Sequence, residues 1–74
     1  MVAKKESWAV PELQIDGLGL VKPGKKVKHP VFGRGTVTEI AEWASGEHTI
    51  RIDFGKIGQK WLVPEMAKLR SAWW

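Results

Sequence analysis

Few side chains in this sequence belong to the types that carry out covalent catalysis. Hydrolytic and acyl-transfer reactions need a nucleophile, a base and a partner that orients the base. The chain has no cysteine, its only histidines are His29 and His48, and its serines are Ser7, Ser45 and Ser71. These residues form no catalytic pattern, and the two histidines lack the further ligands that a metal site requires. We therefore expect a non-enzymatic protein with no catalytic residue, no metal site and no cofactor.

The segment Phe32-Gly33-Arg34-Gly35 has the glycine content of a loop that holds a phosphate group. Such a loop leads into the N-terminus of a helix, whose backbone amides contact the anion. Here the next residues, Thr-Val-Thr at 36–38, favour a strand instead. The two glycines therefore predict a tight backbone turn between two strands.

A basic segment is the clearest candidate for contact with an anionic partner. The chain has 12 Lys and Arg against 8 Asp and Glu, a net charge of +4. Between Asp16 and Glu39 there is no acid, and the cations there are Lys22, Lys25, Lys26, Lys28 and Arg34. These side chains could contact phosphates or an acidic protein surface. The alternative is a solvated face without a partner, which is the usual state of exposed lysines.

The chain has 5 tryptophans among its 74 residues, and a tryptophan buries roughly 150–250 Å² when it packs. Trp61 and Leu62 are neighbours in an expected strand, so they must face opposite sides. If Leu62 enters the core, Trp61 is exposed beside Lys60 and can anchor a partner, and we favour this arrangement. Trp43 lies at the end of an expected hairpin, and its side chain could likewise either fill the core or be exposed for binding.

Short strands separated by glycine-containing turns would position these side chains. The expected strands are residues 25–29, 36–43, 49–54, 59–63 and 67–70, with a single helical turn starting at Pro64. The spacing of three between Val37 and Ile40 breaks strict alternation and predicts a bulge. The pattern predicts an all-β fold, a small barrel of about five bent antiparallel strands. A three-stranded sheet with a packed arm is the alternative.

The predicted core follows from alternation along the strands. Ile50, Ile52 and Phe54 point to one side of residues 49–54, so all three should be buried. We expect the same of Val27, Val37, Ile40 and Leu62. His29 should pack beside Phe32.

Residues 22–71 are expected to form the barrel, residues 1–21 an N-terminal arm or linker, and residues 72–74 a tail. Within the arm, short alternating stretches are interrupted by Asp16-Gly17. They could be extended pieces lying against the barrel, or a linker from a longer parent chain. No stretch is long and apolar enough to suggest a membrane span or a signal peptide. We expect an intracellular protein of the cytoplasm.

Two parts of the sequence resemble a known family. Residues 27–37, Val-Lys-His-Pro-Val-Phe-Gly-Arg-Gly-Thr-Val, look like the opening of the Tudor-like, SH3-like domain at the C-terminus of UvrD/PcrA-type helicases. The same opening is similar to RNA polymerase-interacting domains of the CarD and Mfd type. Residues 60–69, Lys-Trp-Leu-Val-Pro-Glu-Met-Ala-Lys-Leu, are similar to the end of the helicase domain. The resemblance covers residues 22–70, and the chain departs from the family pattern at Lys25, Pro64 and Met66.

This resemblance implies an SH3-like or Tudor-like barrel with a protein-docking role. RNA polymerase, or another component of the transcription and repair machinery, is the implied partner. No Gly-x-x-x-x-Gly-Lys-Ser/Thr motif occurs in the chain, so the ATPase activity of the helicases is not expected here. The residues expected to contact the partner are Phe32, Arg34, Trp43, Lys60 and Trp61. Direct nucleic-acid binding through the basic segment and a structural, self-associating role are the alternatives.

Overall fold

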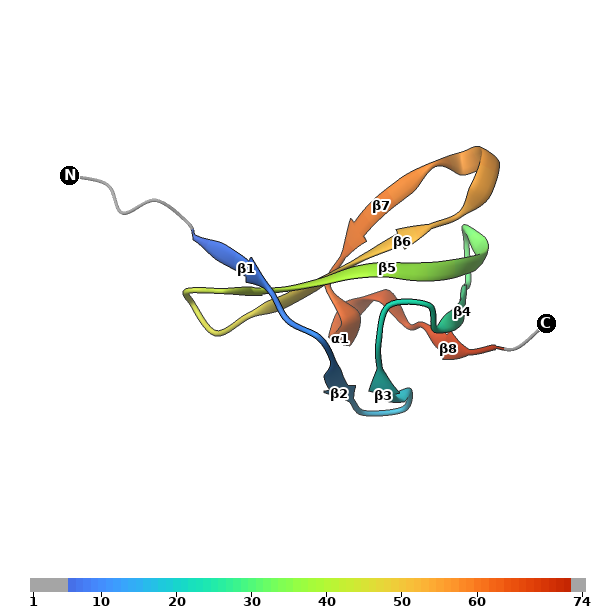
Figure 1. The fold of residues 1–74 in the computed structure, drawn as a ribbon. Coiled ribbons are helices and arrows are strands. Elements are labelled where there is room, and N and C mark those ends of the chain that lie inside the picture. The colour runs from blue at the N-terminus through green and yellow to red at the C-terminus, as the bar shows by residue number, and fades with distance from the viewer. Residues whose placement is uncertain (1–5, 73–74) are drawn as a thin grey trace.

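The computed structural model describes residues 6–72, which form short strands connected by tight turns (Figure 1). In chain order the elements are β1 (Ser7–Ala9), β2 (Leu13–Ile15), β3 (Gly19–Val21), β4 (Lys26–His29), β5 (Gly33–Trp43), β6 (His48–Asp53), the 3-10 turn η1 (Gly55–Ile57), β7 (Gln59–Leu62), α1 (Pro64–Ala67) and β8 (Arg70–Ser71). Residues 1–5 of the expected arm and 73–74 of the expected tail lie outside the described part. Between residues 6 and 72, no helix is long and apolar enough to cross a membrane.

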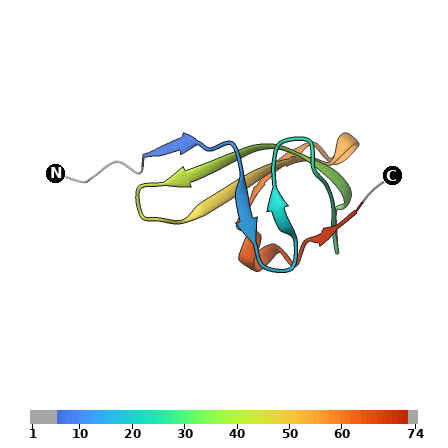
Figure 2. The ribbon, with the colours of Figure 1, turned by 60° about the horizontal axis from the view of Figure 1, so that its bottom comes forward.

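One antiparallel sheet contains most of the strands, in the order β7-β6-β5-β4-β8. The first half of β5 pairs with β4, and its second half pairs with β1. Figures 1 and 2 show the long β5–β6 hairpin with β1 beside its tip, while β2 and β3 form a separate hairpin. This path of five strands, with a short helix before the last, confirms the predicted all-β, barrel-like fold.

A bulge bends β5 at the predicted place. Val37 pairs with Ile52, but the next pair is Glu39 with Arg51, so Thr38 is an extra residue on β5. The extra residue keeps both Val37 and Ile40 on the inner face although they are three positions apart. Both side chains are buried, which confirms the bulge that their spacing predicts.

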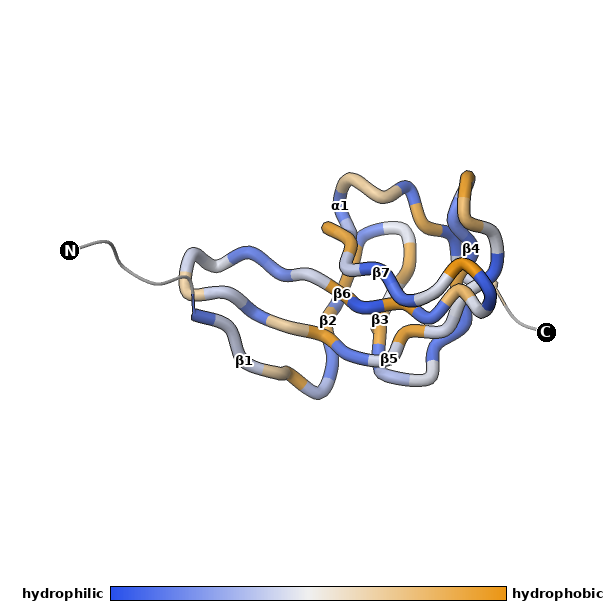
Figure 3. Tube along the Cα trace, turned by 90° about the horizontal axis from the view of Figure 1, so that it is seen from above, coloured by the Kyte–Doolittle hydropathy of each residue, from blue (hydrophilic) through white to orange (hydrophobic). Residues whose placement is uncertain are grey.

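The core lies between the β5–β6 hairpin and the strands that curl over it. Its buried side chains are Ile15, Leu18, Val21, Val27, Val37, Ile40, Ile50, Ile52 and Phe54. Six of the seven predicted core residues are among them. Leu62 is only partly buried and packs against the cluster from its edge. In Figure 3, hydrophobic stretches gather where β2, β3, β5 and β6 come together.

Residues 6–21 lie against the barrel as extended pieces, the first of the two alternatives for this segment. The backbone N–H of Val10 donates to the carbonyl oxygen of Ile40 at 2.9 Å, continuing the pairing of β1 with β5. The β2–β3 hairpin adds Ile15, Leu18 and Val21 to the core. The boundary drawn at residue 21 stays a prediction, but the hairpin before it supplies three buried side chains.

The prediction of a tight turn at Gly33-Arg34-Gly35 is wrong for the second glycine. The turn occupies residues 30–32, and Gly33 already begins β5, with a positive φ of 81°. Gly35 lies inside the strand, where a Cβ atom would come within 2.5 Å of Ile52 Cγ2 and 2.7 Å of Phe54 Cδ1. Gly35 is therefore needed for close packing against the core, whereas Gly33 supplies the left-handed conformation that leaves the turn.

The last strand also lies later than predicted. Residues 67–70 were expected to form it, but Ala67 ends α1 and Lys68 adopts a left-handed conformation with φ 54°. β8 therefore contains only Arg70 and Ser71, which pair with Lys28 and Val27. The left-handed residue reverses the chain after the helix and brings β8 alongside β4.

Candidate functional site

A groove on the outer face of the sheet brings three tryptophans together. Its lining residues are Ser7, Trp8, Ala9, Glu39, Ala41, Trp43, Thr49 and Trp61, and it encloses about 500 Å³. Pairing of β1 with β5 and of β5 with β6 brings these residues together, because Ala9 lies opposite Ala41 and Ala41 lies opposite Thr49. We call this feature the tryptophan groove.

Trp61 is one of two half-exposed tryptophans that line the groove, the other being Trp8. Its side chain is 48% exposed, while Leu62 next to it packs against the core. This confirms the favoured arrangement of the two residues in β7. Lys60, on the other side of Trp61, pairs with the buried Ile52 and so points away from the groove.

Trp43 forms a more fixed wall of the same groove. The indole Nε1–H donates to Thr49 Oγ1 at 2.9 Å, and the ring is partly buried. Its strand continues into a tight turn in which the Gly46 amide donates to the Trp43 carbonyl oxygen at 2.8 Å. The hydrogen bond and the turn hold this indole in one orientation, so a ligand meets a preformed wall.

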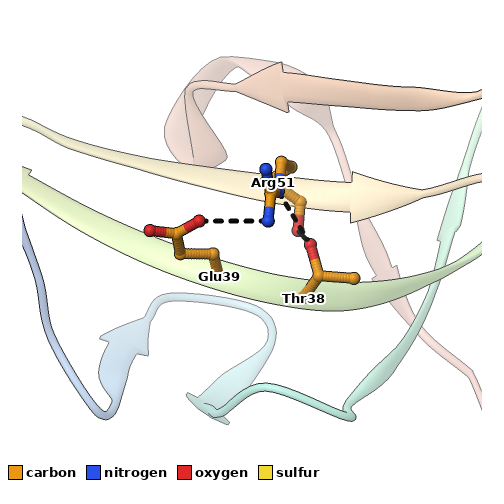
Figure 4. A network of polar contacts seen from close by, with 3 residues as sticks. All are labelled: Thr38, Glu39 and Arg51. Carbon is orange, nitrogen blue, oxygen red and sulfur yellow. Dashed lines mark hydrogen bonds and ion pairs between the residues drawn. The ribbon is translucent and has the colours of Figure 1, made fainter.

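A polar network fixes the side of the groove next to Trp61 (Figure 4). The Arg51 guanidinium lies 5.6 Å from the centroid of the Trp61 ring and 3.2 Å from Glu39 Oε1. The bulge residue Thr38 accepts a hydrogen bond from Arg51 Nε at 3.2 Å and donates one to the Arg51 carbonyl oxygen at 3.1 Å. Arg51 therefore connects the bulge in β5 to the exposed indole of β7.

The five residues predicted to contact a partner fall in different places. Trp43 and Trp61 line the groove. Phe32 lies elsewhere, stacked on His29 with 4.4 Å between ring centroids and 5.3 Å from Phe54. Lys60 Nζ lies 5.3 Å from the centroid of the Phe32 ring, so these two predicted residues lie together, away from the groove. The fifth, Arg34, is an exposed residue near the start of β5.

The histidines have structural partners. His29 Nδ1 accepts hydrogen bonds from the backbone amides of Val31 and Phe32, at 3.0 and 3.1 Å. This ring caps the 30–32 turn and packs beside Phe32, as predicted. His48 Nε2 lies 3.9 Å from Glu42 Oε1 at the tip of the hairpin, and its side chain is partly buried. Within residues 6–72, His, Asp and Glu side chains form no group of three that could hold a metal ion.

The cations of the basic segment surround β4. Lys25 Nζ donates to Ser71 Oγ, and Lys26 Nζ donates to Thr36 Oγ1, both at 3.1 Å. Lys28 and Arg34 lie opposite each other on β4 and β5. Lys22 is exposed in the connection that precedes β4.

The sequence alone did not identify several residues of the tryptophan groove and of the basic surface around β4. Arg51 and Thr49 alternate with buried isoleucines, so their outward direction was available from the sequence, but their position beside the tryptophans was not. Trp8 and Arg70 required knowledge of which distant strands pair. No local signal in the sequence supplies that knowledge.

Comparison with known proteins points to one kind of helicase. DNA helicase II of Salmonella typhimurium and that of Escherichia coli are each 41% identical to this chain over 51 residues. DNA helicase II of Haemophilus influenzae is 44% identical over 50 residues. Each match covers 68% of this chain, which spans only 7% of the length of these curated relatives.

No protein-family model matches the chain. The solved structures contain no significant match either. The chain is thus related, over about two thirds of its length, to a short segment of DNA helicase II.

Proposed function

We propose that this domain is a non-enzymatic docking module whose tryptophan groove binds a protein. The observation that carries the proposal is the exposure of Trp61 in the same groove as the hydrogen-bonded indole of Trp43, together with small side chains in the lining. Tryptophan and arginine are the residues on which binding energy most often concentrates in protein interfaces. Here both types lie side by side, because Arg51 contacts the Trp61 ring.

The groove favours a partner that inserts an apolar side chain between the two indoles. Ala9, Ala41 and Thr49 leave room for such a group between the larger rings. Glu39 and Arg51 at the edge can then exchange their mutual ion pair for contacts with polar atoms of the partner. Since both charges are partly exposed, that exchange costs little.

RNA polymerase is the partner that we propose. The support is the resemblance of residues 27–37 and 60–69 to polymerase-interacting barrels, together with the relation to DNA helicase II. A non-enzymatic role agrees with the histidines, since His29 caps a turn and His48 faces Glu42.

Binding of purified bacterial core RNA polymerase to the immobilised 74-residue chain tests the proposal. Removal of an interface anchor costs ~2 kcal/mol or more, so Trp61→Ala should weaken binding by about 30-fold or more. Met66→Ala is the matched control, because Met66 is a large apolar residue that is 79% exposed and does not line the groove.

The outcomes separate the two parts of the proposal. If the unmodified chain does not bind the polymerase, the choice of partner is wrong. If the chain binds and Trp61→Ala binds equally well, the polymerase is the partner but the groove is not the contact.

A further inference from the structure

Four paired strands share one outward surface at the end of the sheet that carries the tryptophan groove. β5 lies between β1 and β6, and β7 flanks β6 on its other side. Ile40 and Ile50 are paired and buried, so the positions that alternate with them face outward. The residues at these outward positions, which we call the hairpin face, are Ser7, Ala9, Glu39, Ala41, Trp43, Thr49, Arg51 and Trp61.

The hairpin face is electrically neutral in a basic chain. Its charged residues are Glu39 and Arg51, whereas the whole chain has a net charge of +4. The two side chains lie directly opposite each other on β5 and β6 and form an ion pair of 3.2 Å (Figure 4). Each is still 39% exposed, so both can reach charges on a second molecule. Two copies of the chain can therefore approach through this face with little of the repulsion that their net charge creates elsewhere.

We infer that two copies of the chain associate through their hairpin faces, related by a two-fold axis. A contact of this kind joins the same patch on both copies, so the patch must be complementary to itself. Packed sheets lie about 10 Å apart, with their strands nearly aligned. When the axis runs parallel to the strands between β5 and β6, β5 of one copy lies over β6 of the other. Glu39 then faces Arg51 of the second copy, and Arg51 faces Glu39 of the second copy, because the two residues share one register position.

The same axis sets large side chains against small ones. Ala41 and Thr49 are also directly opposite each other, so Ala41 faces Thr49 of the second copy. β7 of one copy lies over β1 of the other, which brings Trp61 toward Ala9 of the second copy. Since Trp61 is 48% exposed, its indole can enter the groove of about 500 Å³ that the small side chains help to line. Size and charge thus both match when the face meets a copy of itself.

The hairpin face is smaller than a standard protein interface, which has about 20–30 residues on each side. We therefore expect a weak dimer that forms at high concentration. The inference uses the groove of the proposed function but does not need the polymerase. A monomeric chain that binds the polymerase would overturn only the dimer, and a dimer that fails to bind it would overturn only the proposed function.

Sedimentation equilibrium of the 74-residue chain, from about 10 µM to about 1 mM, tests the inference. The apparent mass should rise from that of a monomer toward that of a dimer. Trp61→Ala removes the indole that enters the second copy and should weaken association by about 30-fold or more. Met66→Ala should leave it unchanged, because Met66 is 79% exposed and does not belong to the hairpin face.

Two charge reversals test the arrangement of the two copies. Glu39→Lys sets cation against cation across the axis, and Arg51→Glu sets acid against acid. Each variant alone should therefore associate more weakly by about 10-fold or more. An equal mixture of the two restores opposite charges at both contacts, and it should form a one-to-one dimer.

Two further variants control for the change in net charge. Glu65→Lys and Lys56→Glu make the same changes at exposed positions outside the hairpin face, so each should associate like the unmodified chain. Circular dichroism spectra check that all variants are folded. If a charge reversal unfolds the chain, the comparison of Trp61→Ala with Met66→Ala decides.

Three results would overturn the inference. The first is an unmodified chain that stays monomeric up to about 1 mM. The second is a Trp61→Ala variant that associates as tightly as the unmodified chain. The third is a mixture of folded Glu39→Lys and Arg51→Glu variants that associates no better than either variant alone, because the two faces would then not meet in this arrangement.

Discussion

Thr38 and Arg51 are joined by two hydrogen bonds that run in opposite directions. The threonine hydroxyl donates to the Arg51 carbonyl oxygen and accepts from Arg51 Nε (Figure 4). Since Thr38 is the extra residue of the bulge, it has no regular partner on β6 and is free to turn its hydroxyl toward Arg51. The irregularity in β5 thereby positions the guanidinium that lies over Trp61.

Replacing Thr38 by Ala should loosen the contact between Arg51 and Trp61. It should also lower the free energy of unfolding by about 1 kcal/mol, the usual contribution of a hydrogen bond. Thr38→Ser keeps the hydroxyl and should lose much less. Urea denaturation measures the change in the free energy of unfolding, and the NMR shift of the Trp61 indole N–H reports the movement of Arg51. Equal stability and an unmoved indole signal in Thr38→Ala would show that the bulge does not position Arg51.

Phe54 should contribute far more to stability than Leu62. Phe54 is 6% exposed and belongs to the core, so Phe54→Ala should cost ~3–5 kcal/mol and can unfold so small a domain. Leu62 packs only partly against the core, and Leu62→Ala should cost less. Thermal unfolding followed by circular dichroism makes the comparison. An unchanged melting temperature for Phe54→Ala would contradict the assigned core.

His29 should be replaceable in part by asparagine but not by alanine. His29→Ala removes the acceptor of two backbone amides and the stacked ring beside Phe32, a loss of about 1–2 kcal/mol. The side chain of asparagine can accept a hydrogen bond from a backbone amide two residues ahead, so His29→Asn should recover some of this loss. Denaturant titration of the three proteins tests the order of stability. Equal values for the two variants would mean that the turn does not depend on the cap.

Local patterns in the sequence predict the barrel strands β4 to β7, but not the position of β8. Alternation along residues 49–54 correctly separates the buried Ile50 and Ile52 from the outward-facing Arg51. The spacing of Val37 and Ile40 reveals the bulge, and Pro64 marks the start of α1. These features depend on neighbours in the chain, which is why they can be read from a single sequence.

Pairing between distant segments is not available from such patterns. The β2 and β3 strands have only three residues each, which is too short for alternation to show that Ile15 and Val21 are buried. The tryptophan groove depends on β1 pairing with β5, and the placement of Arg70 beside Lys28 depends on β8 pairing with β4. Gly35 looks like a turn residue until its distance to Ile52 is known.

The pairing of β1 has a consequence for how the domain avoids aggregation. β5 extends beyond β4, so without β1 the backbone amides and carbonyls at its far end would form an open sheet edge. Such an edge can pair with the same strand of another molecule. Ala9 and Val10 occupy it instead, the latter through its hydrogen bond to Ile40. A chain beginning after Val10 would leave that edge uncovered, and its β5–β6 hairpins would be able to join edge to edge into larger assemblies.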